Sequence, residues 1–288
     1  MASGGSAGLR VTQSQDAGMF REMAERPAHP GLDEYVGLLC GYEERPDVPM
    51  RRREVPHGRI TIILSFGDKI ELVENAGSPP PGMMTSFVAG LHDGHTIVES
   101  GRQHGIQLDL TPLGAYRLLG LPMDEIAGQV VPLDDVRGRA IDELVERLAT
   151  APGWSERFDL VDRTLLGWAE DGPQPDPEVR WAWNQLARNH GQIAVGPLAV
   201  ETGWSHRHFV TRFRRQVGLA PKPTGRILRF RRAVRLLVEA GPDTTITDVA
   251  VSSGYADHSH FTHEFQSLAG CTPSAYLSTQ LPAGGFEG

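Results

Sequence analysis

The N-terminal half of the chain alternates short apolar runs with clusters of turn-forming residues. The runs are rich in β-branched residues, and the clusters GD, GSPPPG, HDG and SGRQ separate them. Short runs bounded in this way are typical of antiparallel strands joined by tight turns. We therefore expect a small β-sandwich or barrel whose strands include residues 59–66, 69–74, 86–91, 95–100 and 104–110.

After the last of these strands the apolar residues follow a helical period. Three segments have this pattern, at 111–121, 139–150 and 154–170. The second carries an i, i+3, i+4, i+7 stripe made of Ile141, Leu144, Val145 and Leu148. Such a stripe is compatible with a dimer helix and equally with a helix pair inside one chain.

A polar, proline-rich stretch, DGPQPDP at 171–177, has the composition of a linker. It leads into Asp176, Pro177 and Glu178, a cap residue, a first-turn proline and a first-turn acid, which together predict a helix start. The domains predicted from this boundary are an N-terminal domain at 29–172 (strands about 29–111, helices 112–172), a linker at 173–177 and a helical domain at 178–280.

The helical domain contains a duplicated unit. PLAVETGW at 197–204 matches DVAVSSGY at 248–255 with a shift of 51, which becomes 52 after one extra residue. Each copy then places two phenylalanines, a glycine and a proline at the same offsets, namely Phe209, Phe213, Gly218 and Pro221 against Phe261, Phe265, Gly270 and Pro273. This agreement predicts two copies of one supersecondary unit, at about 193–218 and 245–270.

Each unit has the pattern of a helix-turn-helix. A short first helix packs an apolar-alanine pair inward, and a glycine supplies a left-handed turn. Ser205 or Asp257 then caps a second helix whose phenylalanines face the core. The opposite face is the one that reads the major groove in DNA-binding helix-turn-helix proteins. The candidate DNA-binding residues on it are His206, Arg207, Val210, Thr211, Arg214, His258, Ser259, Thr262, His263 and Gln266.

The formal net charge of −8 hides an asymmetry, because ten basic residues lie between Glu201 and Glu239. A basic segment in an acidic protein is typical of a nucleic-acid surface, although alone it also fits a solvated helix face. Within it, residues 225–240 have the pattern of a basic amphipathic helix that would hold the two units at a fixed distance. The candidate phosphate contacts are Arg212, Arg215, Lys222 and Arg226.

The whole segment 177–280 resembles the DNA-binding domain of the AraC/XylS transcription regulators. The resemblance rests on LAVETGWSHRHFVTRFRRQVGLAPK, LRFRRAVRLL and ITDVAVSSGYADHSHFTHEFQSLAGCTPSAYL, in this order and at the family's spacing. Pro223 and Gly225 depart from it, since many relatives have ordinary helix formers there, so we expect the connecting helix to start late. His258 and His263 replace residues that are often Gln and Arg, so base preference does not carry over.

This resemblance implies an α+β protein of two domains, a cupin-like antiparallel β-barrel with following helices and an all-α tandem helix-turn-helix domain. In relatives the β-barrel binds a small effector, mediates dimerisation, or both. Inward strand residues that could line a pocket, or simply form the core, are Ile62, Leu64, Phe66 and Phe87.

The histidines do not have the spacing of metal ligands. His258 and His260 lie about 200° apart on a helix, and no pair among His258, His260 and His263 has the i, i+4 spacing of helical ligands. We expect His260 at the core boundary beside the phenylalanines. In the β-region His92, His95 and His104 lack the pattern of a cupin metal site, so a structural or solvent role is expected and neither metal nor cofactor is predicted.

The termini and cysteines indicate a cytoplasmic, nucleoid-associated protein. Residues 1–28 lack an apolar signal core and are expected to form a disordered tail. No apolar stretch is long enough to span a membrane. Cys40 and Cys271 make neither a disulfide framework nor a CxxC pair, as suits a reducing compartment.

The function predicted from these features is sequence-specific DNA binding by a transcription regulator, not catalysis. We expect it to be effector-responsive and an activator rather than a repressor, to read two adjacent major-groove segments, and to have RNA polymerase and a second copy of the chain as possible partners. One alternative is a small-molecule-binding or enzymatic β-barrel protein with an accessory helical domain. The other is a protein-interaction adaptor whose helix-turn-helix units no longer touch DNA.

Overall fold

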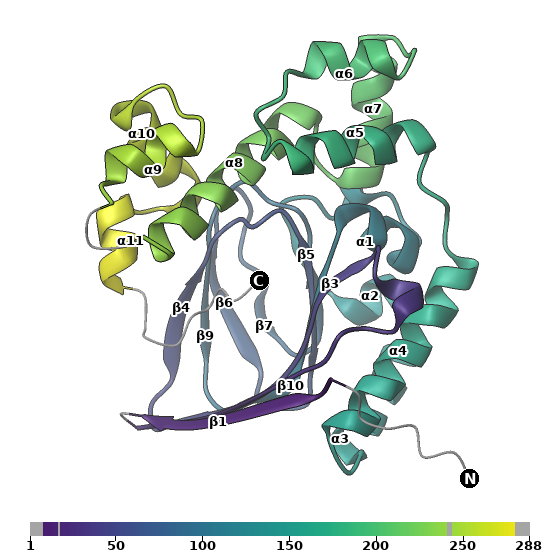
Figure 1. The fold of residues 1–288 in the computed structure, drawn as a ribbon. Coiled ribbons are helices and arrows are strands. Elements are labelled where there is room, and N and C mark those ends of the chain that lie inside the picture. Colours follow the sequence, from purple (N-terminus) through teal and green to yellow (C-terminus); the bar gives the residue numbers. More distant parts are fainter. Residues whose placement is uncertain (1–7, 17, 241–243, 280–288) are drawn as a thin grey trace.

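The computed structural model describes residues 8–16, 18–240 and 244–279. Its N-terminal part holds two antiparallel sheets (Figure 1). The larger sheet has the order β1 (Arg10–Asp16), β2 (Met19–Glu25), β3 (Val36–Pro46), β10 (Gln103–Leu110), β5 (Ile60–Ser65), β8 (Phe87–Ala89) and β11 (Val130–Pro132). The smaller has the order β4 (Met50–Glu54), β9 (Thr96–Ser100), β6 (Ile70–Asn75) and β7 (Gly82–Met84).

The two sheets face one another across a small apolar core. Ile63 and Phe87 of the larger sheet pack there with Ile70, Leu72 and Met84 of the smaller one. The antiparallel β-rich domain expected from the sequence is therefore confirmed, with all five expected strands present. The strands form two facing sheets rather than one closed barrel.

The prediction of a disordered tail at residues 1–28 is wrong for much of that segment. Residues 1–7 lie outside the described residues, but β1 and β2 form a hairpin, and β2 pairs along its whole length with β3. Buried Ala24 and the indole of Trp154, which donates to Glu22 Oε1 at 2.7 Å, fix the hairpin to the domain. Backbone pairing with β3 compensates for a polar sequence that carries little hydrophobic signal.

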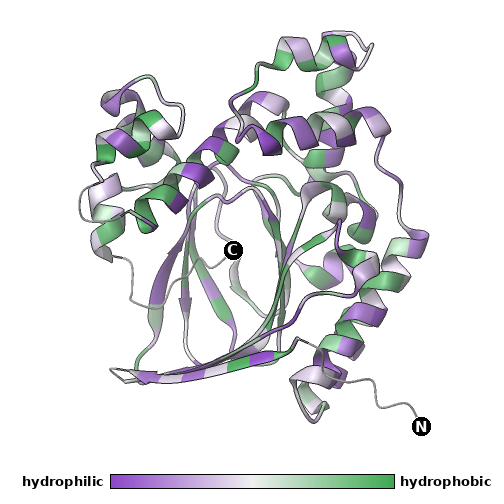
Figure 2. Ribbon diagram, in the orientation of Figure 1, coloured by the Kyte–Doolittle hydropathy of each residue, from purple (hydrophilic) through white to green (hydrophobic). Residues whose placement is uncertain are grey.

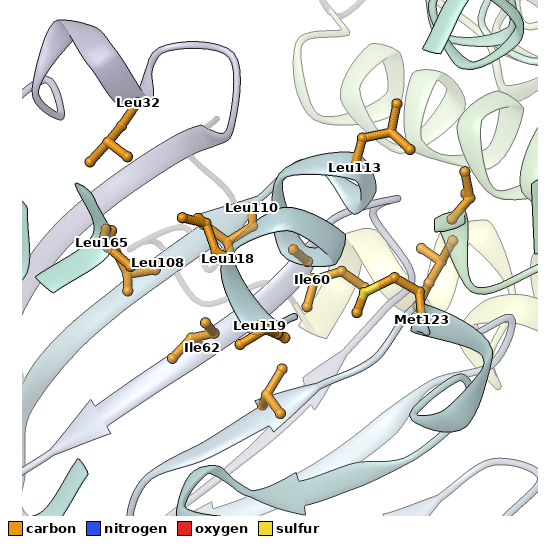
Figure 3. Close-up of a cluster of buried hydrophobic side chains, with 14 of the residues drawn as sticks. Leu32, Ile60, Ile62, Leu108, Leu110, Leu113, Leu118, Leu119, Met123 and Leu165 are labelled. Carbon is orange, nitrogen blue, oxygen red and sulfur yellow. The ribbon is translucent and has the colours of Figure 1, made fainter. Parts of the chain in front are cut away.

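Helices cover the outer face of the larger sheet (Figure 1). They are α1 (Pro112–Leu119), α2 (Leu133–Arg137), α3 (Ala140–Thr150) and α4 (Trp154–Asp171), with short 3₁₀ turns η1 (Pro30–Leu32) and η2 (Met123–Glu125). Ile62, Leu108 and Leu165 lie in one buried cluster between sheet and helices (Figure 3). Ile141, Leu144 and Leu148 are buried in the same cluster, so the stripe on α3 forms an intrachain helix pair with α4.

The described residues of the C-terminal part form helices and connecting loops, without strands. The helices are α5 (Pro177–Arg188), α6 (Val195–Glu201), α7 (His206–Val217), α8 (Pro221–Val238), α9 (Ile246–Ser252), α10 (His258–Ala269) and α11 (Pro273–Thr279). Hydrophobic and hydrophilic positions alternate along these helices (Figure 2). The pairs α6–α7 and α9–α10 are the two helix-turn-helix units expected from the duplication. None of the helices in the described part of the chain combines the length and hydrophobicity needed to cross a bilayer.

The late start expected for the connecting helix is wrong, because α8 begins at Pro221. Pro221 and Pro223 lie in its first turn, where the N–H groups that proline lacks would have no intrahelical partner. Gly225 is buried against the backbone of Gly191. A Cβ added at Gly191 would lie 1.9 Å from the Gly225 carbonyl oxygen. Glycine is therefore needed at 191 for the close approach of α8 to the loop after α5, whereas a Cβ at Gly225 would make a tight contact of 3.0 Å with the Gly191 carbonyl oxygen.

Candidate nucleic-acid interface

The second helix of the first unit, α7, presents a polar face to solvent. The Ser205 hydroxyl caps it by accepting from the backbone N–H of His208 at 3.3 Å. Phe209 and Phe213 are completely buried, so the opposite face points outward. Of the candidates on that face, His206, Arg207, Thr211 and Arg214 are exposed and Val210 is half-buried.

The second unit repeats this arrangement in α10. Asp257 Oδ1 accepts from the backbone N–H of His260 at 2.8 Å, and Phe261 and Phe265 are completely buried. The candidates His258, Ser259, His263 and Gln266 are exposed, and Thr262 is half-buried. The expected left-handed turns are confirmed at Gly203 (φ 71°) and Gly254 (φ 83°).

The candidate phosphate contacts differ in their surroundings. Arg215 and Lys222 are exposed. Arg212 donates from Nε and Nη2 to Asp176 at 2.7 and 2.8 Å, and Arg226 Nε lies 3.4 Å from Glu264 Oε2. Arg212 and Arg226, predicted as phosphate contacts, thus each pair with a carboxylate of the protein.

Asp176 does not cap α5 with its side chain, contrary to the sequence expectation. It occupies the N-cap position, but its carboxylate accepts from Arg212 and Gln216 of α7 instead. Asp176, directly before α5, is therefore bound to α7. Asp176 and Glu264 are functional candidates that the sequence reasoning missed, because nothing in the local pattern distinguishes an anchoring carboxylate from a solvated one.

The two units are joined by α8, whose 18 residues span about 27 Å. They also meet directly, since Gln192 Nε2 before α6 donates to the carbonyl oxygen of Ser253 in the turn of the second unit at 3.3 Å. This contact and the packing of α8 fix the position of the first unit relative to the second in this structure.

Both units contact the β-domain. Arg214 Nε of α7 lies 3.6 Å from Asp124 Oδ2 of η2. At the other unit, Arg53 Nη1 of β4 donates to the carbonyl oxygen of Ala269 at 3.0 Å, and Val55 is buried in the core of that unit. The helical domain is therefore docked on the β-domain at both ends of α8 (Figure 1).

A polar cluster lies under α8, where the helical domain meets the larger sheet. Thr61 Oγ1 donates to Asp109 at 2.8 Å and lies 3.4 Å from the ring of His57. Burial lowers the pKa of His57 to about 4, against the opposing effect of Asp109. Arg59 and Arg231 also act on His57, so the domain contact includes charged groups that the sequence pattern did not reveal.

All three histidines of α10 are exposed, so His260 is more accessible than the expected core-boundary position implies. His260 packs its ring edge-on to Tyr255, with centroids 5.4 Å apart, and Nδ1 accepts from the backbone N–H of Ala256. Within the described residues, no three His, Cys, Asp or Glu side chains gather in a group that could hold a metal ion.

His92, His95 and His104 contact residues of the β-domain, and His95 also packs against the helical domain, since a Cβ at Gly270 would lie 2.3 Å from its ring. His92 Nδ1 lies 2.9 Å from the carbonyl oxygen of Gly90, and burial lowers its pKa. His95 Nε2 lies 2.8 Å from Glu74 Oε1. The ring of His104 packs between Phe66 and Trp154.

The residues named as pocket candidates lie in packed cores. Ile62 and Leu64 face α3 and α4 rather than the space between the sheets, whereas Phe87 lies between the sheets. The cavity lined by Ile62 and Leu64 has no room for a water molecule.

Comparison with protein families divides the chain in two. Residues 198–279 match a family described as a helix-turn-helix domain. Residues 24–132 match a domain of unknown function, DUF6597. The first match covers both helix-turn-helix units from the middle of α6, and the second runs from the last two residues of β2 to the end of β11.

The chain is similar to an uncharacterized HTH-type transcriptional regulator, YbfI, of Bacillus subtilis (strain 168). The two are 29% identical over 89 residues, which is 31% of this chain and 31% of that protein, so the match spans less than a third of either. Among solved structures, the DNA-binding domain of AdpA, a global transcriptional factor in complex with a target DNA, is 30% identical (TM-score 0.32, 36% of this chain, 91% of that chain). ToxT from Vibrio cholerae O395 is 12% identical (TM-score 0.44, 82% of this chain, 98% of that chain).

Proposed function

Because the C-terminal domain of this chain is an AraC/XylS-type tandem helix-turn-helix domain, we propose that the protein is a sequence-specific, DNA-binding transcription regulator. One observation carries the proposal. α7 and α10 have the same kind of N-cap, bury phenylalanines at equivalent positions and expose polar faces. Their two helix-turn-helix units are connected through the helix α8. Two reading helices on one rigid connector fit two neighbouring major-groove segments, which lie about 34 Å apart along one face of a duplex.

The exposed residues divide between base reading and phosphate binding. Arg207, near the start of α7, is the best candidate for a bidentate contact with a guanine edge. His206, Val210, Thr211 and Arg214 complete the first reading face, and His258, Ser259, Thr262, His263 and Gln266 form the second. Arg215 and Lys222 are exposed cations suited to phosphates.

The β-domain is proposed to regulate this activity. Contacts at both ends of α8 couple it to the reading helices, so a small-molecule effector that alters the β-domain would alter DNA binding. We further propose activation rather than repression, with RNA polymerase as a partner and a homodimer as the acting form. Such a regulator works on the nucleoid in the cytoplasm.

The test is a selection of duplexes from a randomised library by the full-length protein at moderate salt. The expected result is an enriched motif with two elements about one helical turn apart. Its copy number in each duplex reports whether the protein binds as a dimer. Recovery of only salt-labile, non-specific DNA would overturn sequence-specific binding and favour the small-molecule-binding or adaptor alternatives.

A further inference from the structure

The two repeats place oppositely charged residues at one equivalent position. Arg212 and Glu264 correspond under the shift of 52, and each directly precedes the second buried phenylalanine of its reading helix. Each makes an ion pair with an element outside its own helix-turn-helix pair. The repeat has therefore kept an anchoring position while reversing its charge.

In the first unit the partner is Asp176 at the end of the linker. Arg212 binds both carboxylate oxygens, at 2.7 and 2.8 Å. Gln216, completely buried one turn further along α7, donates to Asp176 Oδ2 at 2.7 Å and accepts from the Asp176 backbone N–H at 2.9 Å. Two successive turns of α7 are thus fixed to the residue that begins α5.

In the second unit two partners come from the connecting helix, and a third group, His260 Nε2 of α10 itself, lies 3.8 Å from Glu264 Oε2. The Glu264 side chain is only 10% exposed. Arg226 Nε lies 3.4 Å from its Oε2, and Arg229 Nη2 lies 3.5 Å from its Oε1. Arg229 also lies over the ring of buried Tyr255, 5.1 Å from its centroid. Two arginines spaced by three residues on α8 thus hold α10 through one carboxylate.

We propose that Arg212 and Glu264 are positioning residues, which set the angles of α7 and α10 for DNA reading without touching DNA themselves. This inference rests on the proposed function. Glu264 cannot face a phosphate, because two negative charges repel. Since the repeats share one geometry, the equivalent Arg212 faces away from the DNA backbone too. Its guanidinium is held by Asp176 through a bidentate pair, and its side chain is 36% exposed, less than the 61% of Arg214 on the outward face.

The decisive comparison is between Asp176→Asn and Arg212→Met. If Arg212 positions α7, both variants remove the same anchor. Each then weakens binding to the selected duplex roughly three- to tenfold, and the double variant is no weaker than either single one. If Arg212 were a phosphate contact, Asp176→Asn would release it and tighten binding instead. That outcome would overturn the proposal.

Salt dependence and element scrambling add readouts that a general loss of stability would not give. The salt slope of the Arg212→Met variant is expected to match wild type, whereas the matched control Arg215→Met lowers it by about one. The loss of affinity caused by Arg212→Met should vanish on a duplex whose first element is scrambled. The loss of affinity caused by Glu264→Gln should vanish on a duplex whose second element is scrambled, and persist when only the first is scrambled. Equal losses on every duplex would contradict positioning.

A DNA-free measurement separates this inference from the proposed function. Amide hydrogen exchange of the full chain should accelerate in α7, and not in α10, for Asp176→Asn and Arg212→Met alike. The charge-reversed double variant D176R/R212D should restore slow exchange in α7. Unchanged exchange in both single variants would refute the anchor whether or not the protein binds DNA. Intact anchors with no selected motif would refute only the proposed function.

Discussion

Asp124 of η2 lies 3.6 Å from Arg214 of α7, carboxylate oxygen to guanidinium Nε. Asp124 of the β-domain thus pairs with Arg214, a candidate DNA contact. Asp124 and DNA therefore compete for the same guanidinium group. Both side chains are partly solvated, so the pair contributes at most about 1 kcal/mol. Asp124→Asn should therefore tighten DNA binding about two- to fivefold at low salt, with a smaller gain at high salt.

The matched control is Asp142→Asn, which removes the same charge from an exposed position on α3, at the opposite end of the molecule from α7 (Figure 1). Fluorescence anisotropy with the selected duplex gives both dissociation constants. Unchanged affinity for Asp124→Asn, or an equal gain in the control, would show that the docked η2 does not compete with DNA.

Arg207→Ala tests the main base-reading assignment. Loss of a bidentate contact should cost about 1–3 kcal/mol of discrimination at one base pair of the first element. Binding to duplexes that differ at that base pair, compared with wild type, measures the cost. Arg163→Ala, an exposed arginine on α4, is the control and should leave the preference unchanged. A variant as selective as wild type would remove Arg207 from the reading face.

The helical domain was predictable because its signals are local and occur twice. Ser205 and Asp257 cap their helices, the glycines form the left-handed turns, and the paired phenylalanines are buried, as the sequence pattern predicts. Each of these roles depends only on residues nearby in the sequence. A second copy at fixed offsets makes accidental agreement improbable.

The features that the sequence did not predict depend on contacts distant along the chain. The polar hairpin of β1 and β2 exists because β3 offers a pairing edge. The charge of Arg212 alone predicts a phosphate contact, whereas its partner in the structure is Asp176, 36 residues away. The cluster of His57 and Asp109 forms only where a strand and α8 meet. Long-range register and pairing of this kind leave no periodic trace in one sequence.

Gly191→Ala should destabilise the fold strongly. Gly191 has φ 73°, and a Cβ there would lie 1.9 Å from the carbonyl oxygen of Gly225. Left-handed strain and the backbone clash should together lower the free energy of unfolding by about 2–4 kcal/mol. Gly196→Ala is the matched control, because it lies in α6 with no atom within 4 Å of the new Cβ. It should change stability by less than about 1 kcal/mol in the favourable direction. Urea unfolding of both variants checks this, and equal effects would contradict the close backbone approach.

The buried His57 should make the protein less stable in mild acid. Burial lowers its pKa in the folded chain to about 4 from an ordinary value of 6.5. Between these two values the unfolded chain binds a proton that the native protein does not. Stability is therefore fully present above pH 6.5 and falls as pH drops towards 4, by up to about 1.4 kcal/mol per pH unit. Buried His92 has a pKa shifted in the same direction and adds to the effect.

The free energy of unfolding, measured by urea titration from pH 7.5 to 4, isolates this contribution. His57→Gln keeps a polar side chain beside Thr61 but cannot gain the proton, so its stability should fall less steeply with acid, by at most about 3 kcal/mol over the range. The control His263→Gln alters an exposed ring and should follow the wild-type curve. Parallel curves for wild type and His57→Gln would mean that His57 takes up its proton as readily in the native protein as in the unfolded chain. The interface of α8 with the β-domain would then be open to water at that point.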